Sequence, residues 1–226
     1  MMIADQLRKI KQEIPSSVKL IAVSKTMPVS ALNAAYLPGQ RRFGENKVQE
    51  LIAKQADMPA DVEWHFIGHL QTNKVKALVH VVDVIESVDS FRLLTEINKQ
   101  AAKINRRIDC LLQFHIAEEE TKFGLDLTEA ADMLLSESFN AMKNVRICGV
   151  MGMATFTDNT DQLRKEFSQL RTYFMDLKSR FFRDDEAFCE ISMGMSGDYL
   201  IAIEEGSTMV RIGSLIFGER NYGSAT

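Results

Sequence analysis

The chain has 226 residues, of which 46% are hydrophobic and 26% are charged, and its formal net charge is −4. This length and composition fit one large globular domain or two small ones. The weak negative charge argues against general binding to nucleic acid or to anionic membranes, and no apolar stretch is long enough to span a bilayer.

The N-terminal residues and the cysteines predict a cytoplasmic protein. The first residues lack the basic start and the apolar core of a signal peptide. Cys110, Cys148 and Cys189 lie far apart in separate apolar runs, so we expect buried, reduced thiols rather than disulfides or a zinc site.

Short apolar runs alternate with amphipathic segments along the chain. A leading helix is expected over residues 3–13. The apolar runs predict strands over residues 19–25, 41–45, 63–68, 81–87, 108–116, 145–153, 187–194 and 209–217. The segments between them predict helices over residues 29–35, 47–56, 72–78, 90–103, 128–142, 161–182 and 198–205.

This alternation predicts the fold class. Continuous apolar strands that alternate with helices are typical of a parallel sheet covered on both faces. Eight such units predict an α/β fold, a single (β/α)8 TIM barrel with an extra N-terminal helix. The alternative is a doubly wound open sheet. No linker rich in Pro, Gly or Ser interrupts the chain, so residues 1–226 are expected to form one domain.

One lysine stands where such a barrel carries its chemistry, which is at the carboxyl ends of the strands. The first predicted strand ends in Lys25, directly before Thr26-Met27-Pro28. An amine that is partly shielded from water can titrate low enough to act as a nucleophile toward a carbonyl group. The alternative interpretation is an ordinary solvated lysine.

Small residues crowd the ends of the last two predicted strands. Ser196 and Gly197 precede a predicted helix that begins near Asp198, and they offer backbone N–H groups, a hydroxyl and the positive end of a helix dipole. Gly213-Ser214 offers a second set of backbone N–H groups. Barrels commonly bind phosphate at these two loops. The alternative for the first loop is a helix N-cap alone.

Arg211 is predicted to point into the barrel, because it shares a strand face with Gly213 by the strand period of two. Closure of a barrel places the last strand beside the first, and therefore places Lys25 beside the phosphate loops. An amine next to a phosphate site is the arrangement that holds pyridoxal 5′-phosphate (PLP) as a Schiff base. A buried arginine needs an acceptor. In a PLP site, the acceptor for Arg211 is the pyridine nitrogen, which the arginine would keep unprotonated. The alternative is a structural ion pair with Glu45 or Glu190.

The histidines His65 and His69 are four residues apart, which is a ligand spacing on a helix. The residues around them predict a strand, where this spacing amounts to about 13 Å. We therefore expect no metal site there.

Seven motifs in chain order resemble one known family. They are IAVSKT at 21–26, FGEN at 43–46, WHFIG at 64–68, LQTNK at 70–74, GVMGMA at 149–154, SMGMS at 192–196 and GSTMVRIG at 206–213. Together they resemble the pyridoxal phosphate homeostasis proteins, the YggS/PROSC family, whose barrel is related to the N-terminal domain of alanine racemase. The motifs span almost the whole chain, so the resemblance is specific.

The resemblance implies a covalent PLP site. In the family pattern a lysine forms the aldimine, two serines and a glycine contact the phosphate, an arginine faces the pyridine nitrogen and an asparagine lines the ring pocket. In this sequence the resemblance implies that Lys25 forms the aldimine and that Ser196, Ser214 and Gly213 contact the phosphate. It also implies that Arg211 faces the pyridine nitrogen and that Asn46 lines the ring pocket.

Besides His115, which stands where an asparagine is common in the strand-five motif, three positions depart from the family pattern. Met27 stands where a second lysine is common, Lys47 where an aromatic residue is common, and Gly197 where an acidic residue is usual. These departures bear on contacts at the rim of the site and on the handling of released cofactor, whereas the central cofactor set is intact.

The resemblance also implies a function. We expect a non-catalytic carrier that takes part in intracellular PLP (vitamin B6) homeostasis, buffers the cofactor and delivers it to apo PLP-dependent enzymes through transient contact. A monomer is expected, with no nucleic-acid or membrane partner.

The main alternative is a PLP-dependent amino-acid racemase or a related enzyme. Two-base racemisation needs a second proton carrier opposite the lysine, and in the racemase family this group is a tyrosine from an added C-terminal domain of the partner subunit. Tyr199 and Tyr222 match no such motif, although a weak racemase-like side activity is compatible with the site. A third hypothesis is an enzyme in which Lys25 forms a Schiff base with a sugar phosphate.

Overall fold

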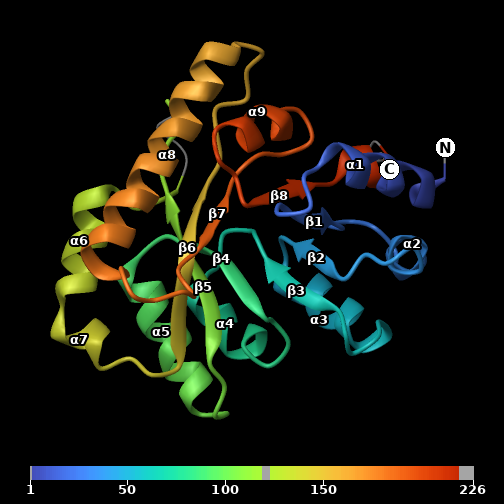
Figure 1. The fold of residues 1–226 in the computed structure, drawn as a ribbon. Helices are drawn as coiled ribbons and strands as arrows, with labels where there is room; N and C mark the ends of the chain where they lie inside the picture. The colour runs from blue at the N-terminus through green and yellow to red at the C-terminus, as the bar shows by residue number, and fades with distance from the viewer. Residues whose placement is uncertain (1, 119–122, 219–226) are drawn as a thin grey trace, which may run out of the picture.

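A computed structural model describes residues 2–118 and 123–218 of the chain. Eight parallel strands close into a barrel in the order β1 to β8, and helices surround it (Figure 1). The strands are β1 (Lys19–Val23), β2 (Arg42–Glu45), β3 (Glu63–Phe66), β4 (Val84–Val88), β5 (Ile108–Phe114), β6 (Val145–Gly152), β7 (Glu190–Ser192) and β8 (Met209–Ile212). The predicted (β/α)8 barrel is confirmed, and the open sheet is wrong.

Helices follow the strands, and one helix precedes them. They are α1 (Ile3–Glu13), α2 (Val29–Tyr36), α3 (Val48–Asp57), α4 (Thr72–Leu78), α5 (Phe91–Ala102), α6 (Leu127–Leu135), α7 (Glu137–Asn140), α8 (Thr160–Phe181), α9 (Tyr199–Glu204) and α10 (Ser214–Phe217). The predicted leading helix is α1, which packs against α2 and α10. No helix in the described part of the chain is long and apolar enough to cross a membrane.

The main hydrophobic core lies between the strands and the helices, and the barrel interior is different in character. Cys110 and Leu112 of β5 belong to the main core, whereas Leu111 belongs to a small separate cluster with Cys148 and Met151. Successive side chains of a strand point to opposite faces, so this small cluster lies inside the barrel. The rest of the interior is therefore open to polar side chains.

Six of the eight predicted strands end one to five residues earlier than expected, and the last two show why. The strand predicted over 209–217 stops at Ile212, and α10 begins at Ser214, with Ile216 buried. A short apolar run does not distinguish a buried strand from a buried helical turn. The strand predicted over 187–194 ends at Ser192, and Gly194 follows with a φ of +94°, a backbone conformation that favours glycine.

Two further sequence predictions are wrong. The helix predicted over 128–142 is divided into α6 and α7 at Ser136, whose side chain accepts a hydrogen bond from Phe139 N and begins the second helix. Cys189 is exposed rather than buried, because it precedes the first residue of β7 at the edge of the barrel. Cys110 and Cys148 are buried free thiols, as predicted.

Candidate functional site

A cavity of about 590 Å³ lies at the carboxyl ends of the strands. Side chains and backbone from the loops after β1, β2, β6, β7 and β8 line it. All six predicted site residues are among them: Lys25, Asn46, Ser196, Arg211, Gly213 and Ser214. The structure thus brings together residues that are up to 189 positions apart in the sequence, from Lys25 to Ser214.

Lys25 stands two residues beyond the end of β1 and is half-buried. The next residue, Thr26, has a φ of +66°, which is unusual for a residue other than glycine. Its backbone N–H donates to Glu50 Oε2 at 2.8 Å, so a side chain from α3 holds this turn in place. The strained turn directs the chain out of the barrel immediately after the lysine.

A buried lysine of α3, Lys54, stabilises the same turn after β1. Lys54 Nζ donates to Ser24 O at 2.8 Å, to Glu45 Oε1 at 2.8 Å and to Glu50 Oε2 at 3.3 Å. Ser24 Oγ also donates to Glu45 Oε1, at 2.6 Å. Burial raises the pKa of Glu45, although Lys54 and Ser24 oppose the shift. Residues on both sides of Lys25 are therefore tied to one buried ion-pair cluster.

Sequence reasoning missed Lys54, although the sequence held a signal. Lys54 follows Leu51 by three residues, and Leu51 is buried. Residues at this spacing share one helix face, so a lysine on the apolar face of a predicted helix indicates a buried charge with a partner.

The loops after β7 and β8 meet next to Lys25. Gly213 N donates to Ser196 Oγ at 3.3 Å, which links the two loops. A Cβ on Gly213 would lie 3.1 Å from Val23 O, so the glycine lets the end of β8 approach the end of β1 closely. Gly197 is exposed and has open space around it. This group of backbone N–H donors and hydroxyls suits a phosphate.

The N-cap interpretation of the Ser196 loop is wrong, because the N-cap residue Asp198 makes no side-chain capping hydrogen bond to the helix. The helix α9 begins at Tyr199, and Asp198 Oδ1 accepts a hydrogen bond from Met195 N rather than from within the helix. Ser196 Oγ contacts Gly213 and caps nothing. The loop is therefore organised toward β8 and the cavity.

Arg211 is buried in the barrel interior and reaches the cavity. Its Nη1 donates to Ser192 Oγ at 2.6 Å, and its Nη2 donates to Gly152 O at 2.9 Å. Its carboxylate neighbour is Glu86 of β4, with Oε2 3.9 Å from Nη1. The predicted structural partners were wrong, since they have other ion pairs: Glu45 with Lys54 and Glu190 with Lys19.

Glu86 was not predicted as the partner of Arg211, although the sequence held a signal. It is a charged residue directly after the apolar residues Val84 and Ile85 of a predicted strand. It is fully buried, and its two oxygens contact Ser192 and His65. His69, in contrast, is partly exposed, contacts Asp89 and stacks on Phe123. The two histidines thus lie in separate environments.

One buried polar atom of the cavity wall lacks a protein partner. Asn46 Oδ1 is buried and accepts no hydrogen bond from the described residues. A buried acceptor of this kind is costly unless a ligand or water satisfies it. Together with the amine, the phosphate-type donors and the arginine, this orphan acceptor fits a pyridoxal phosphate ligand in the cavity.

Three of the departures from the family pattern lie at the rim or behind it. Lys47, with 70% of its side chain exposed, precedes α3. Met27 is partly buried and packs against the main core, so it faces away from solvent in the position where the family often has a lysine. Gly197 lines the cavity and leaves its mouth open.

Comparison with known proteins agrees with this geometry. A sequence model of the alanine racemase N-terminal domain matches residues 2–221. The pyridoxal phosphate homeostasis protein of Aquifex aeolicus is 40% identical over 205 residues, which cover 90% of this chain and 88% of the relative. That of Escherichia coli K12 is 36% identical over 212 residues, with 92% and 88% coverage.

The chain belongs to the pyridoxal phosphate homeostasis protein family. Its fold matches PipY of Synechococcus elongatus, solved with PLP bound, with a TM-score of 0.86 at 37% identity over 96% of this chain and 100% of PipY. Alanine racemase from E. faecalis shares the fold, with a TM-score of 0.78 at 16% identity, and this chain covers 59% of it. The suspected family resemblance is confirmed.

We expect Lys54→Met to destabilise the protein by about 3–5 kcal/mol, because it leaves the buried carboxylate of Glu45 without its cation. The double variant Lys54→Met/Glu45→Gln should recover a large part of this loss, because it removes both charges. Urea unfolding of the four proteins of this cycle measures the coupling. Losses that simply add in the double variant would contradict the buried ion pair.

The stability of the protein should also fall in alkaline solution because of His65. Burial, the largest effect, opposes its protonation, but hydrogen bonds and charges from Glu63 and Glu86 outweigh burial and raise its pKa from 6.5 to about 9. A raised pKa contributes stability that is complete below the unfolded-state value and is lost as pH rises through the folded-state value. The loss is therefore expected between pH 6.5 and about 9.

Urea unfolding of the wild type and Glu63→Gln at about pH 7 and about pH 10 measures this contribution. The variant should lose less stability over this interval, because its His65 has only one carboxylate partner. Glu137→Gln, on the exposed surface of α7, is the control and should behave as the wild type. An equal alkaline loss in wild type and Glu63→Gln would refute the assignment.

Proposed function

We propose that this chain binds PLP reversibly as a Schiff base on Lys25 and takes part in cofactor homeostasis by holding it and delivering it to apo-enzymes. The observation that carries the proposal is the convergence of Lys25, the Ser196–Gly213 pair and Arg211 on one cavity. PipY, at 37% identity, was solved with PLP bound, and it supports the choice of ligand.

Each group has a defined task in this proposal. The cofactor supplies an aldehyde and, in enzymes, an electron sink. Lys25 provides the amine that attaches it, and the strained Thr26 turn holds that amine at the cavity wall. The hydroxyls of Ser196 and Ser214 and the backbone N–H of Gly213 donate hydrogen bonds to the phosphate. Arg211 faces the pyridine nitrogen and, as a permanent cation, keeps that nitrogen unprotonated.

Asn46 completes the wall with its unsatisfied oxygen. An unprotonated pyridine nitrogen makes the ring a weaker electron sink, which favours storage of the cofactor over chemistry on an amino acid. Transient contact with apo PLP enzymes then passes the cofactor on, and the open mouth at Gly197 suits release.

A PLP-dependent racemase is the second candidate, favoured by the barrel and by the position of Arg211. It needs a second proton carrier near the cavity. Among the described residues, the cavity wall contains no tyrosine, the residue type that supplies the second base in the racemase family; its carboxylates are Asp158 and Asp198. Tyr199 is buried, and its hydroxyl bonds to Glu13 of α1, while Tyr222 lies outside the described residues. These placements support the carrier over the racemase. Steady interconversion of D- and L-alanine at about 1 s⁻¹ or faster would reverse this preference.

We expect Lys25→Ala to remove the Schiff-base absorbance band that appears when the protein is titrated with PLP, because no other amine stands at this point of the cavity wall among the described lining residues. Lys47→Ala is the matched control, since it removes an exposed lysine next to Asn46. It should keep the band. A full band in Lys25→Ala would refute the role of the lysine.

Delivery is tested separately, with loaded protein, an apo PLP enzyme and an excess of phosphatase that destroys free PLP. We expect the enzyme to regain activity faster than with the same amount of free PLP, because bound cofactor is shielded until it is transferred. Recovery no better than with free PLP would leave a binding protein without a delivery role.

A further inference from the structure

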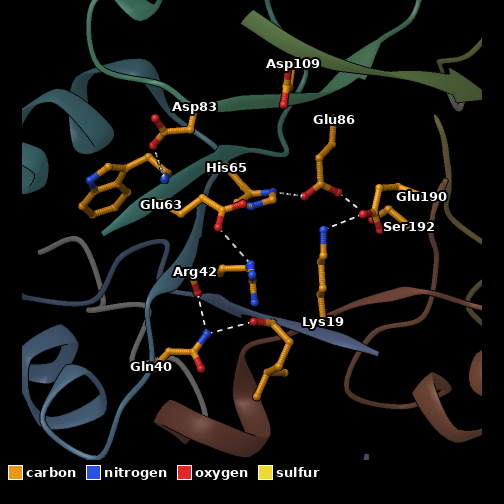
Figure 2. Close-up of polar contacts among 12 residues, drawn as sticks. Lys19, Gln40, Arg42, Glu63, His65, Asp83, Glu86, Asp109, Glu190 and Ser192 are labelled. Atoms are coloured by element: carbon orange, nitrogen blue, oxygen red, sulfur yellow. Dashed lines mark hydrogen bonds and ion pairs between the residues drawn. The ribbon is translucent and has the colours of Figure 1, made fainter. Parts of the chain in front are cut away.

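Charged side chains form a continuous series from the first residues of β2 and β3 to Arg211 at the cavity, and Figure 2 shows its members from Arg42 to Glu86. Glu63 accepts from Arg42 Nε at 2.9 Å and contacts His65 Nε2 at 3.1 Å. Glu86 contacts His65 Nδ1 at 2.7 Å and lies 3.9 Å from Arg211 Nη1. We call these five residues the buried charge series, since its inner three members, His65, Glu86 and Arg211, are buried; the outer two are each 36% exposed. The signs of the charges alternate along the series.

His65 is a cation in this series, as its contacts require. Each of its ring nitrogens faces a carboxylate oxygen, one from Glu63 and one from Glu86. An ionised carboxylate only accepts hydrogen bonds. The pKa values of Glu63 and Glu86 are both lowered, and while these carboxyls are ionised both ring nitrogens carry a proton. The raised pKa of about 9 agrees with this conclusion.

Glu86 is consequently a buried anion between two cations. Burial alone would raise its pKa, but the hydrogen bond and charge of His65, the charge of Arg211 and the hydroxyl of Ser192 lower it. The side chain is fully buried, so these partners replace its hydration. Glu86 therefore stays charged at neutral pH.

Ser192 transmits the orientation of Glu86 to Arg211. The Ser192 hydroxyl donates its only proton to Glu86 Oε2 at 2.6 Å and uses a lone pair to accept from Arg211 Nη1, also at 2.6 Å. A hydroxyl has a single proton, so the acceptor that takes it fixes which lone pairs remain for the arginine.

The guanidinium of Arg211 is then fixed at both ends. Its Nη1 bonds to Ser192 and its Nη2 bonds to Gly152 O. A guanidinium is planar with five N–H groups in a rigid fork, so two bonds determine its plane. The remaining donors are thereby set for a ligand in the cavity that Arg211 lines.

We propose that Glu86 is a positioning residue of the cofactor site: acting through Ser192, and balanced by the cation of His65, it holds Arg211 in the orientation that meets the pyridine ring. This inference rests on the proposed function, because it concerns how Arg211 addresses PLP. In the described part of the chain Glu86 does not itself line the cavity, whereas its neighbour Arg211 does.

The test is Glu86→Gln, which keeps the side-chain shape and removes the charge. We expect PLP to bind about tenfold more weakly, because a charge-assisted hydrogen-bond chain to Arg211 is lost. The absorbance maximum of the bound cofactor should also shift, because the environment of the pyridine nitrogen changes. A purely structural role would not move the spectrum of the molecules that remain folded and loaded.

Glu190→Gln is the matched control. Glu190 is also a buried strand carboxylate in an ion pair, with Lys19 at 2.5 Å, and it accepts from Thr208 Oγ1 at 2.8 Å, but it lies outside the buried charge series. Figure 2 shows Lys19 and Glu190 beside the series. This variant should lose stability in urea unfolding while its PLP affinity and spectrum remain those of the wild type.

An affinity and a spectrum of Glu86→Gln equal to those of the wild type would overturn the proposal. If Glu86→Gln does not fold, Ser192→Ala takes its place, since it breaks the link to Arg211 without removing a charge. It should weaken PLP binding about threefold with the same direction of spectral shift, and unchanged values would overturn the proposal. Wild-type protein that binds no PLP would refute the proposed function itself, so the two failures are distinguishable.

Discussion

The pairing of β1 with β8 is the contact on which the site depends. Ile21 lies opposite Arg211 and Ala22 opposite Ile212, in parallel register. This register brings the carboxyl ends of the first and last strands to the same level, so Lys25 and Gly213 reach one cavity although the sequence separates them widely. A side chain at Gly213 would press on Val23 O and force the two ends apart.

A second physical problem is how to bury the charges near the site. Isolated ions are very costly in a protein interior. Two clusters solve it by giving each carboxylate a cationic neighbour: between β2 and α3, Glu45 has Lys54, and in the barrel interior, Glu86 has His65 and Arg211. One cluster secures the turn that carries Lys25, and the other secures Arg211. Lys25 and Arg211, the two groups that would address the cofactor in the proposed function, thus both depend on charged side chains behind the cavity wall.

Much of the fold and of the site could be predicted from the sequence. Strand-helix alternation predicted the barrel. The strand period of two correctly predicted that Arg211 points into the barrel, where it is buried. The ends of β7 and β8 could not be predicted, because apolar residues after Ile212 suit a strand as well as the turn of helix that forms there. The partner of Arg211 also escaped prediction: Glu86 and Arg211 are brought together only by closure of the barrel.

The central claim is that Lys25 is the amine that tethers PLP. Reduction of the PLP-loaded protein with borohydride, followed by proteolysis and mass spectrometry, tests this most directly, because it converts the Schiff base into a stable adduct at the residue that formed it. The account predicts a single major adduct on Lys25. An adduct on another lysine with Lys25 unmodified, or no adduct at all, would contradict it.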